Sequence, residues 1–234
     1  MKRMDFHGFI LAALASSLLF PAGQTQQPPS SSGSSSSQHA HKPVVSPDSR
    51  LDVGSVSKGL YRNPGFGFTC KIPAGWVLRT DELNARDEDE SESDAGKSAR
   101  ESGSAGRVLL AAFARPPQAR GEDVNSSILI AAESASSYPG LKDAAQYFGP
   151  VSEVAKAQGF TVDEEPYEFA VGAKILVRGD FEKNVGSRAM RQATLVILAK
   201  GYAVSFTFIG GTEDEVEELV AGLSFGAAAK PQSH

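Results

Sequence analysis

Residues 61–76 read YRNPGFGFTCKIPAGW, and this stretch decides the fold class of the chain. From Phe66 to Ile72 every second residue is apolar or Cys70, which is the period of a half-buried strand. The Pro-Ala-Gly sequence at 73–75 predicts a turn, and the only tryptophan, Trp76, follows it. We therefore expect a strand that ends in a turn, with Trp76 packed at the edge of a sheet.

Cys70 is the only cysteine of the chain. A single cysteine excludes an internal disulfide and a metal site built from several thiolates. Because Cys70 is in phase with Phe68 and Ile72, we expect a small core residue rather than a reactive thiol.

The remainder of the chain predicts more strands and two helices. Compact or alternating apolar runs predict strands at 108–114, 127–133, 160–163, 167–171, 173–182, 188–199 and 202–209. Apolar stripes predict helices at 141–158 and 212–223, the second started by a capping box of Thr212 and Glu215. Gly149-Pro150 leaves open either two short helices or one kinked helix in the first segment. This order of elements predicts an α+β fold with an antiparallel sheet and helices laid on it.

The two ends of the chain are predicted to lie outside the fold. Two basic residues and an apolar run at 9–20 make residues 1–23 resemble a secretory signal peptide. If the signal is cleaved, we expect no membrane span in the protein that remains. Because the cleavage site is imperfect, the alternative is that the signal stays as an N-terminal anchor. Residues 24–59 are rich in Ser, Pro and Gln and predict a disordered tether. The folded domain is expected at 60–226, a disordered tail at 227–234, and the protein in the periplasm or outside the cell.

Residues 81–106 form a polar insertion that we expect to be a flexible loop. Its centre, 86–94, reads RDEDESESD. Asp87, Asp89 and Ser91 match the first positions of an EF-hand, but Glu92 and Ser98 stand where that loop needs Gly and Glu. A solvated run of charge is the expectation, and divalent-cation binding by 87–94 is the alternative.

The available side chains exclude several chemistries. The four histidines are at 7, 39, 41 and 234, so the expected domain holds no imidazole for a Ser-His-Asp or Cys-His mechanism. A net charge of -5 and the lack of a basic run argue against nucleic-acid binding. Carboxylate catalysis by Glu133, Glu164, Glu165 or Asp180 is an alternative, although we expect these to be exposed acids at strand edges. We assign no catalytic, cofactor-binding or metal-binding residue.

The opening stretch also resembles a known family. Tyr61-x-Asn63, Phe66-Gly67-Phe68 and Ile72-Pro73-x-Gly75-Trp76 resemble the N-terminal signature of the PsbP-like superfamily, whose bacterial relatives include DcrB-type and LpqN-type exported proteins. The resemblance covers residues 60–225 and implies an α-β-α sandwich, a central antiparallel sheet flanked by helices.

Together these features predict an exported, non-catalytic domain without a cofactor. Because the resemblance implies a binding or assembly scaffold, we expect this domain to bind an envelope protein. We also expect it to be a monomer. A small-ligand or divalent-metal carrier and a carboxylate-based hydrolase are the alternatives.

Overall fold

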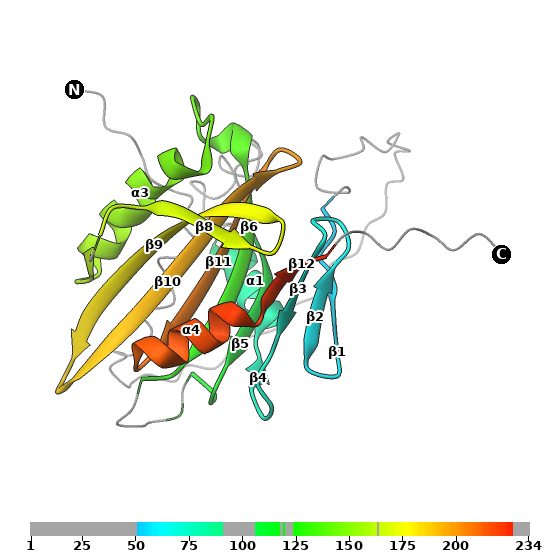
Figure 1. Ribbon diagram of the computed structural model, residues 1–234. Coiled ribbons are helices and arrows are strands. Elements are labelled where there is room, and N and C mark those ends of the chain that lie inside the picture. Colours follow the sequence, from blue (N-terminus) through cyan, green and yellow to red (C-terminus); the bar gives the residue numbers. More distant parts are fainter. Residues whose placement is uncertain (1–50, 91–105, 118, 120–123, 163, 227–234) are drawn as a thin grey trace, which may run out of the picture.

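The computed structural model describes residues 51–90, 106–117, 119, 124–162 and 164–226, without the side chains of 86–90 (Figure 1). The predicted signal peptide, most of the predicted tether and the C-terminal tail lie outside this part. Within it the chain has the predicted α+β character, with all strand pairs antiparallel. None of the described helices is both long and apolar enough to cross a membrane.

The larger sheet has eight strands and forms the centre of the domain (Figure 1). Six of them make the middle of the sheet and one edge: β4 (Val77–Leu78), β5 (Arg107–Phe113), β6 (Ser127–Ser134), β11 (Tyr202–Gly210), β10 (Arg188–Ala199) and β9 (Lys174–Val185). Two short strands, β7 (Thr161–Val162) and β8 (Tyr167–Val171), pair with β9 at the other edge. All of the strands predicted beyond residue 106 are thus present.

A second sheet of four strands was not predicted. Its order is β1 (Ser55–Ser57), β2 (Leu60–Asn63), β3 (Phe68–Lys71) and β12 (Leu223–Phe225). The opening stretch is therefore a hairpin, and the strand expected to start at Phe66 starts two residues later. The reason lies in the Asn63 side chain, whose Oδ1 accepts from the Phe66 N–H at 2.8 Å and holds 64–67 in a turn. Gly67 has a φ of +75°, which glycine adopts without strain.

The ordered fold also begins earlier than the predicted residue 60. The Asp52 carboxylate accepts from the Gly65 N–H at 2.7 Å, and its carbonyl accepts from Asn63 Nδ2 at 2.7 Å. The Tyr61 hydroxyl donates to the Val53 carbonyl at 2.9 Å. These bonds fix the residues before β1 to β2 and the β2–β3 turn. Composition alone had assigned these residues to the tether.

The two faces of the larger sheet have different covers, so the fold differs from the predicted sandwich of helices around one sheet. The smaller sheet and α4 (Glu213–Ala221) cover one face. The other face carries α3 (Ala144–Ala157) and α1 (Thr80–Glu90). Figure 1 shows the smaller sheet beside the larger one and α4 across its strands.

Helix α3 settles the question left open by Gly149-Pro150, because one helix runs through both residues. The Asp143 side chain caps its start by accepting from the Gln146 N–H at 3.0 Å. Gly159 follows the helix with a φ of +86°, as predicted for its C-terminal end. A 3₁₀ turn, η3 (Ala135–Ser137), lies between β6 and this helix.

Helix α4 has the predicted N-cap with one change of partner. Thr212 Oγ1 accepts from the Glu215 N–H at 3.2 Å. The Glu215 carboxylate does not return to Thr212 but accepts from the Gly211 N–H at 2.9 Å and from Ser126 Oγ at 2.5 Å. It thereby joins the helix to the start of β6. The helix ends at Ala221, two residues before the prediction, because β12 begins at Leu223.

Helix α1 contradicts the expectation of a loop from Asp81 onward, while residues 91–105 lie outside the described part. Its first turns bind the edge of β5. Thr80 Oγ1 accepts from the Ala111 N–H, and the Asn84 amide exchanges two hydrogen bonds with the Val108 backbone, all at 3.0 Å. Leu83 packs against Val108 and its apolar neighbours. These side chains cover an otherwise open sheet edge, a contact that the acidic composition concealed.

Candidate functional site

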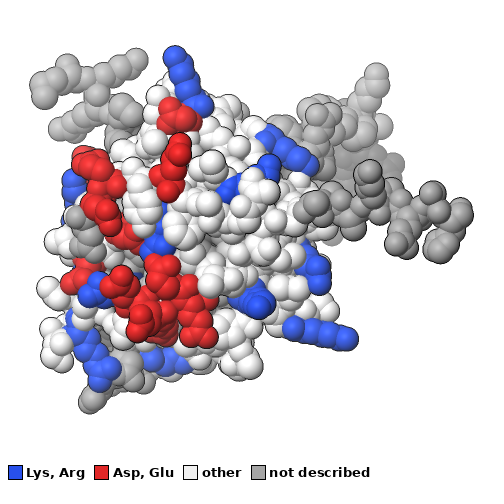
Figure 2. All heavy atoms as spheres, in the orientation of Figure 1, with Lys and Arg blue, Asp and Glu red and all other residues white. Residues whose placement is uncertain are grey.

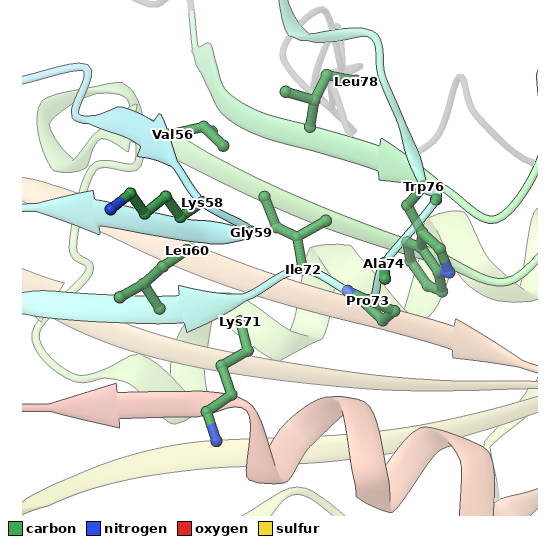
Figure 3. Close-up of a pocket in the computed structure, with 11 residues that line it drawn as sticks. Val56, Lys58, Gly59, Leu60, Lys71, Ile72, Pro73, Ala74, Trp76 and Leu78 are labelled. Atoms are coloured by element: carbon green, nitrogen blue, oxygen red, sulfur yellow. The ribbon is translucent and has the colours of Figure 1, made fainter.

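A shallow groove of about 730 Å³ lies where the β1–β2 turn approaches the segment between β3 and β4 (Figure 3). Its lining comes from the two ends of the opening stretch and the strands beside it. The lining residues are Val56, Lys58, Gly59, Leu60, Lys71, Ile72, Pro73, Ala74, Gly75, Trp76 and Leu78.

Two turns set the shape of this groove. Lys58 and Gly59 have φ values of 51° and 70°, so β1 and β2 are joined by a two-residue turn in which both residues are left-handed. The Gly59 carbonyl accepts from the Ile72 N–H at 2.8 Å, which fixes this turn against the end of β3. Gly75, at a φ of 84°, then reverses the chain toward Trp76.

The middle of the groove is apolar and open to solvent. Val56 on β1 is 40% exposed and Leu78 on β4 is 44% exposed, whereas most large apolar residues of the domain are buried. Ile72 lines the same hollow and is drawn below Val56 and Leu78 in Figure 3, with the Trp76 ring to one side. Trp76 is partly buried and packs against the main core, so it lies at a sheet edge as predicted.

The groove is also cationic. Among the residues that the structure describes, its titratable lining residues are Lys58 and Lys71, and both are exposed. Figure 3 shows both ammonium groups directed away from the apolar middle, toward the rim. Acidic side chains gather elsewhere, over α4 (Figure 2), where Glu213, Asp214 and Glu218 are exposed. The apolar hollow and its basic rim are therefore distinct from the acidic surface.

A second unusual cluster surrounds Glu133, which is only 1% exposed at the end of β6. The Tyr138 hydroxyl donates to its carboxylate, and the Tyr138 ring meets the buried Tyr147 ring edge-on at 5.3 Å. Burial raises the pKa of Glu133 to about 7, although the two tyrosine hydroxyls oppose the shift. Sequence reasoning placed Glu133 among exposed strand-edge acids, which is wrong, because its strand is covered up to its last residues.

Asp180 lies on the opposite face of the sheet, beside Arg178. The Arg178 guanidinium binds the Asp180 carboxylate at 2.8 Å and also pairs with Glu217 of α4. The Arg178 charge lies 5.0 Å from the centre of the Phe169 ring, and the Tyr167 hydroxyl donates to Asp180 at 3.0 Å. These contacts fix α4 and β8 to β9, so the cluster has a structural explanation.

The other residues singled out from sequence do not assemble into a site within the described residues. Cys70 is fully buried as predicted, and burial raises its thiol pKa to about 12. Glu164 and Glu165 are exposed before β8, and the sheet separates Glu133 from Asp180. The described residues hold no group of three His, Cys, Asp or Glu suited to a metal ion. The side chains of 87–94 lie outside the described part, as do His39 and His41.

Sequence reasoning missed the groove as a site. It treated Val56 and Lys58 as tether, and it treated the turn at 73–75 only as the end of a strand. The available signal was the Lys-Gly pair at 58–59 between two short alternating segments, a pattern that favours a tight hairpin.

Comparison with known proteins gives no family. No family model matches the chain, and no curated protein matches it. Solved structures with some similarity include a Bacteroides thetaiotaomicron protein, with a TM-score of 0.35 and 12% identity over 71% of this chain and 47% of that one. LpqN of Mycobacterium tuberculosis, described as involved in cell envelope biogenesis, has a TM-score of 0.33 and 12% identity over 67% of this chain and 82% of that one. A Pseudomonas aeruginosa protein of unknown function has a TM-score of 0.31 and 18% identity over 43% and 68%. At these scores we infer neither a fold family nor a function.

Proposed function

We propose that this chain is an exported, non-catalytic domain of PsbP-like type that binds a protein partner in the cell envelope. The groove beside Trp76 is the contact surface. The observation that carries the proposal is the exposure of Val56 and Leu78 around one apolar hollow. Contiguous exposed apolar surface is uncommon on proteins without partners and is typical of interaction sites.

The shape of the hollow favours a protein over a small molecule. Sites for small molecules enclose most of the ligand surface. Here Val56 and Leu78 both stand at the solvent boundary, and the lysines are directed outward. A broad partner that covers these side chains gains more apolar contact than a small ligand lying between them.

A photo-crosslinking amino acid placed at Val56 or Leu78 tests this proposal in the native envelope. We expect each position to capture the same envelope protein. Ile175, which is 63% exposed at the start of β9, is the matched control and should not capture it. Equal capture from all three positions, or from none, would overturn the proposal.

Charge-introducing variants supply the second measurement. Val56→Asp and Leu78→Asp should each reduce recovery of the captured protein about tenfold or more, because an unpaired carboxylate replaces an apolar contact. Ile175→Asp should leave recovery unchanged. All three positions are exposed, so the domain should keep its thermal midpoint within a few degrees.

The alternative is metal binding by 87–94, whose side chains lie outside the described part. Calorimetry of the whole chain with Ca²⁺ and with Mn²⁺ should give no heat if the run is merely solvated charge. Heat that disappears when 87–94 are deleted would support a carrier function instead.

A further inference from the structure

We propose that the groove receives an extended segment of its partner, which pairs as an added strand with the free edge of β1 and carries acidic residues beside its apolar ones. This inference rests on the proposed function and specifies the mode of binding and the chemistry of the partner.

The backbone of Val56 provides the pairing site. Because the two-residue turn at 58–59 closes the hairpin, Ser57 and Leu60 form its first hydrogen-bonded pair. Val56 and Tyr61 are then the next, non-hydrogen-bonded pair, so the N–H and C=O of Val56 point away from β2. In the sheet order of the described residues, β1 pairs with β2 alone. Val56 thus offers one donor and one acceptor to an incoming strand.

The preceding outward-facing residue, Gly54, limits how far this pairing site extends along β1. One outward-facing residue earlier, the Gly54 N–H already donates to Asp52 Oδ1 at 2.9 Å. The open part of the edge is therefore centred on Val56 and includes the side chain that lines the groove. An added strand at this point would place side chains of one face next to Val56, in the groove that Ile72 and Leu78 also line.

The charge near the free edge of β1 favours an acidic partner. Among the described residues, Lys58 and Lys71 are the ionisable groups that line the groove. Lys58 lies in the turn that ends β1, whereas Lys71 lies on β3, two strands from the free edge of β1. An extended segment beside β1 with aliphatic side chains on one face and carboxylates at its ends would place a carboxylate near Lys58. A basic segment would place a like charge there.

Labelled synthetic peptides and the whole chain test this mode by fluorescence anisotropy. The probe is Asp-Thr-Val-Thr-Val-Thr-Asp, which alternates apolar and polar residues between acidic ends. We expect it to bind, and we expect a version with Lys at both ends to bind about tenfold more weakly. A version with N-methylated amides along one edge keeps the side chains but cannot pair as a strand, so it should not bind measurably.

Two further measurements separate strand pairing from general apolar contact. Saturating peptide should slow hydrogen exchange of the Val56 amide and leave exchange at Val185, at the tip of the β9–β10 hairpin, unchanged. Val56→Pro removes the outward N–H while the hairpin bonds of Ser57 and Leu60 remain, and it should abolish peptide binding. The N-methylated peptide gives the same test on the unaltered chain if this variant does not fold.

The possible results distinguish the added strand from the proposed function itself. Equal binding of the N-methylated peptide, or unchanged exchange at Val56, would overturn the added strand. If crosslinking from Val56 still captures an envelope protein in that case, the proposed function stands without it. Binding to vesicles of phosphatidylglycerol through Val56 and Leu78, with no peptide binding, would overturn the inference in favour of a lipid surface. Failure of both peptide binding and crosslinking would overturn the inference and the proposed function together.

Discussion

The two faces of the larger sheet bury different kinds of side chain. Beneath the smaller sheet, aromatic rings interlock: Phe68 meets Phe206 edge-on at 4.8 Å, and Phe225 packs against both. Beneath α3 and α1 the sheet also buries polar groups, namely Glu133, Thr194, Ser205 and Thr207. The part of the first face beneath the smaller sheet is stabilised by apolar burial, which is insensitive to pH, and the Arg178 ion pairs of this face lie beside it under α4. The second face depends on protonation and on hydrogen-bond partners.

Removing a ring from the aromatic face should have the largest effect. Phe206→Ala should lower the free energy of unfolding by about 4 kcal/mol, because it removes buried apolar surface and leaves a cavity. Denaturant titration at acid and at alkaline pH should show the same loss. The exposed Val185→Ala should change stability by less than about 0.5 kcal/mol. A comparable effect of the two substitutions would mean that the aromatic contacts do not stabilise this face.

The polar face should respond to pH through Glu133. Its folded pKa of about 7 lies above the ordinary value of 4.5, so the fold favours the protonated form. The contribution of Glu133 to the free energy of unfolding is therefore fully present below about pH 4.5. It falls by about 3 kcal/mol in total as the pH rises from there through 7. Glu133→Gln should remove this slope, and the exposed Glu165→Gln should preserve it. Unfolding free energies measured from pH 4 to 9 would contradict this if the Glu133→Gln variant kept the slope of the unaltered chain.

The packing of α3 is the next point at which the polar face can be disturbed. A Cβ added at Gly179 of β9 would lie 2.5 Å from Cε1 of the buried Phe148 ring. Gly179→Ala should therefore cost about 2 kcal/mol through overpacking. Gly149→Ala in the same helix as Phe148 meets nothing within 4 Å and should instead stabilise by up to about 1 kcal/mol. Thermal unfolding of both variants checks the pair, and a loss at Gly149 equal to that at Gly179 would rule out the steric explanation.

The smallest expected effect concerns a pair of buried hydroxyls. Thr194 Oγ1 and Thr207 Oγ1 lie 3.2 Å apart between β10 and β11. Thr194→Val should cost about 1 kcal/mol because Thr207 loses its partner. The double change to valine should recover most of that loss, since neither hydroxyl then remains buried. Additive losses in a double-mutant cycle would show that the pair does not act as a unit.

Local patterns predicted most of the larger sheet and both amphipathic helices. The alternation around Cys70 and the cap at Thr212 involve neighbours within a few residues, so they are visible in sequence. The β2–β3 hairpin was hidden because Phe66 continues the alternation of the strand that follows it. Only the Asn63 side chain, folding back onto the Phe66 N–H, reveals the turn.

The remaining features depend on partners distant in sequence. Helix α1 is polar in composition and is held by Thr80 and Asn84 against β5, which begins after residue 106. β12 has only three residues and is recognisable through its pairing with β3. Glu133 is buried by Tyr138 and Tyr147, which no periodicity connects to it. The groove likewise combines β1 with β4, which belong to different sheets.

The pairing of β12 with β3 has a consequence for how the protein is made. The fourth strand of the smaller sheet is among the last described residues, whereas the other three strands are among the first. During synthesis, Phe68 and Cys70 must therefore wait until more than 150 further residues have been made before Leu223 can pair beside them. A nascent chain stalled before that point would present an aromatic strand edge, so completion of this sheet shows that the chain has been synthesised through Phe225.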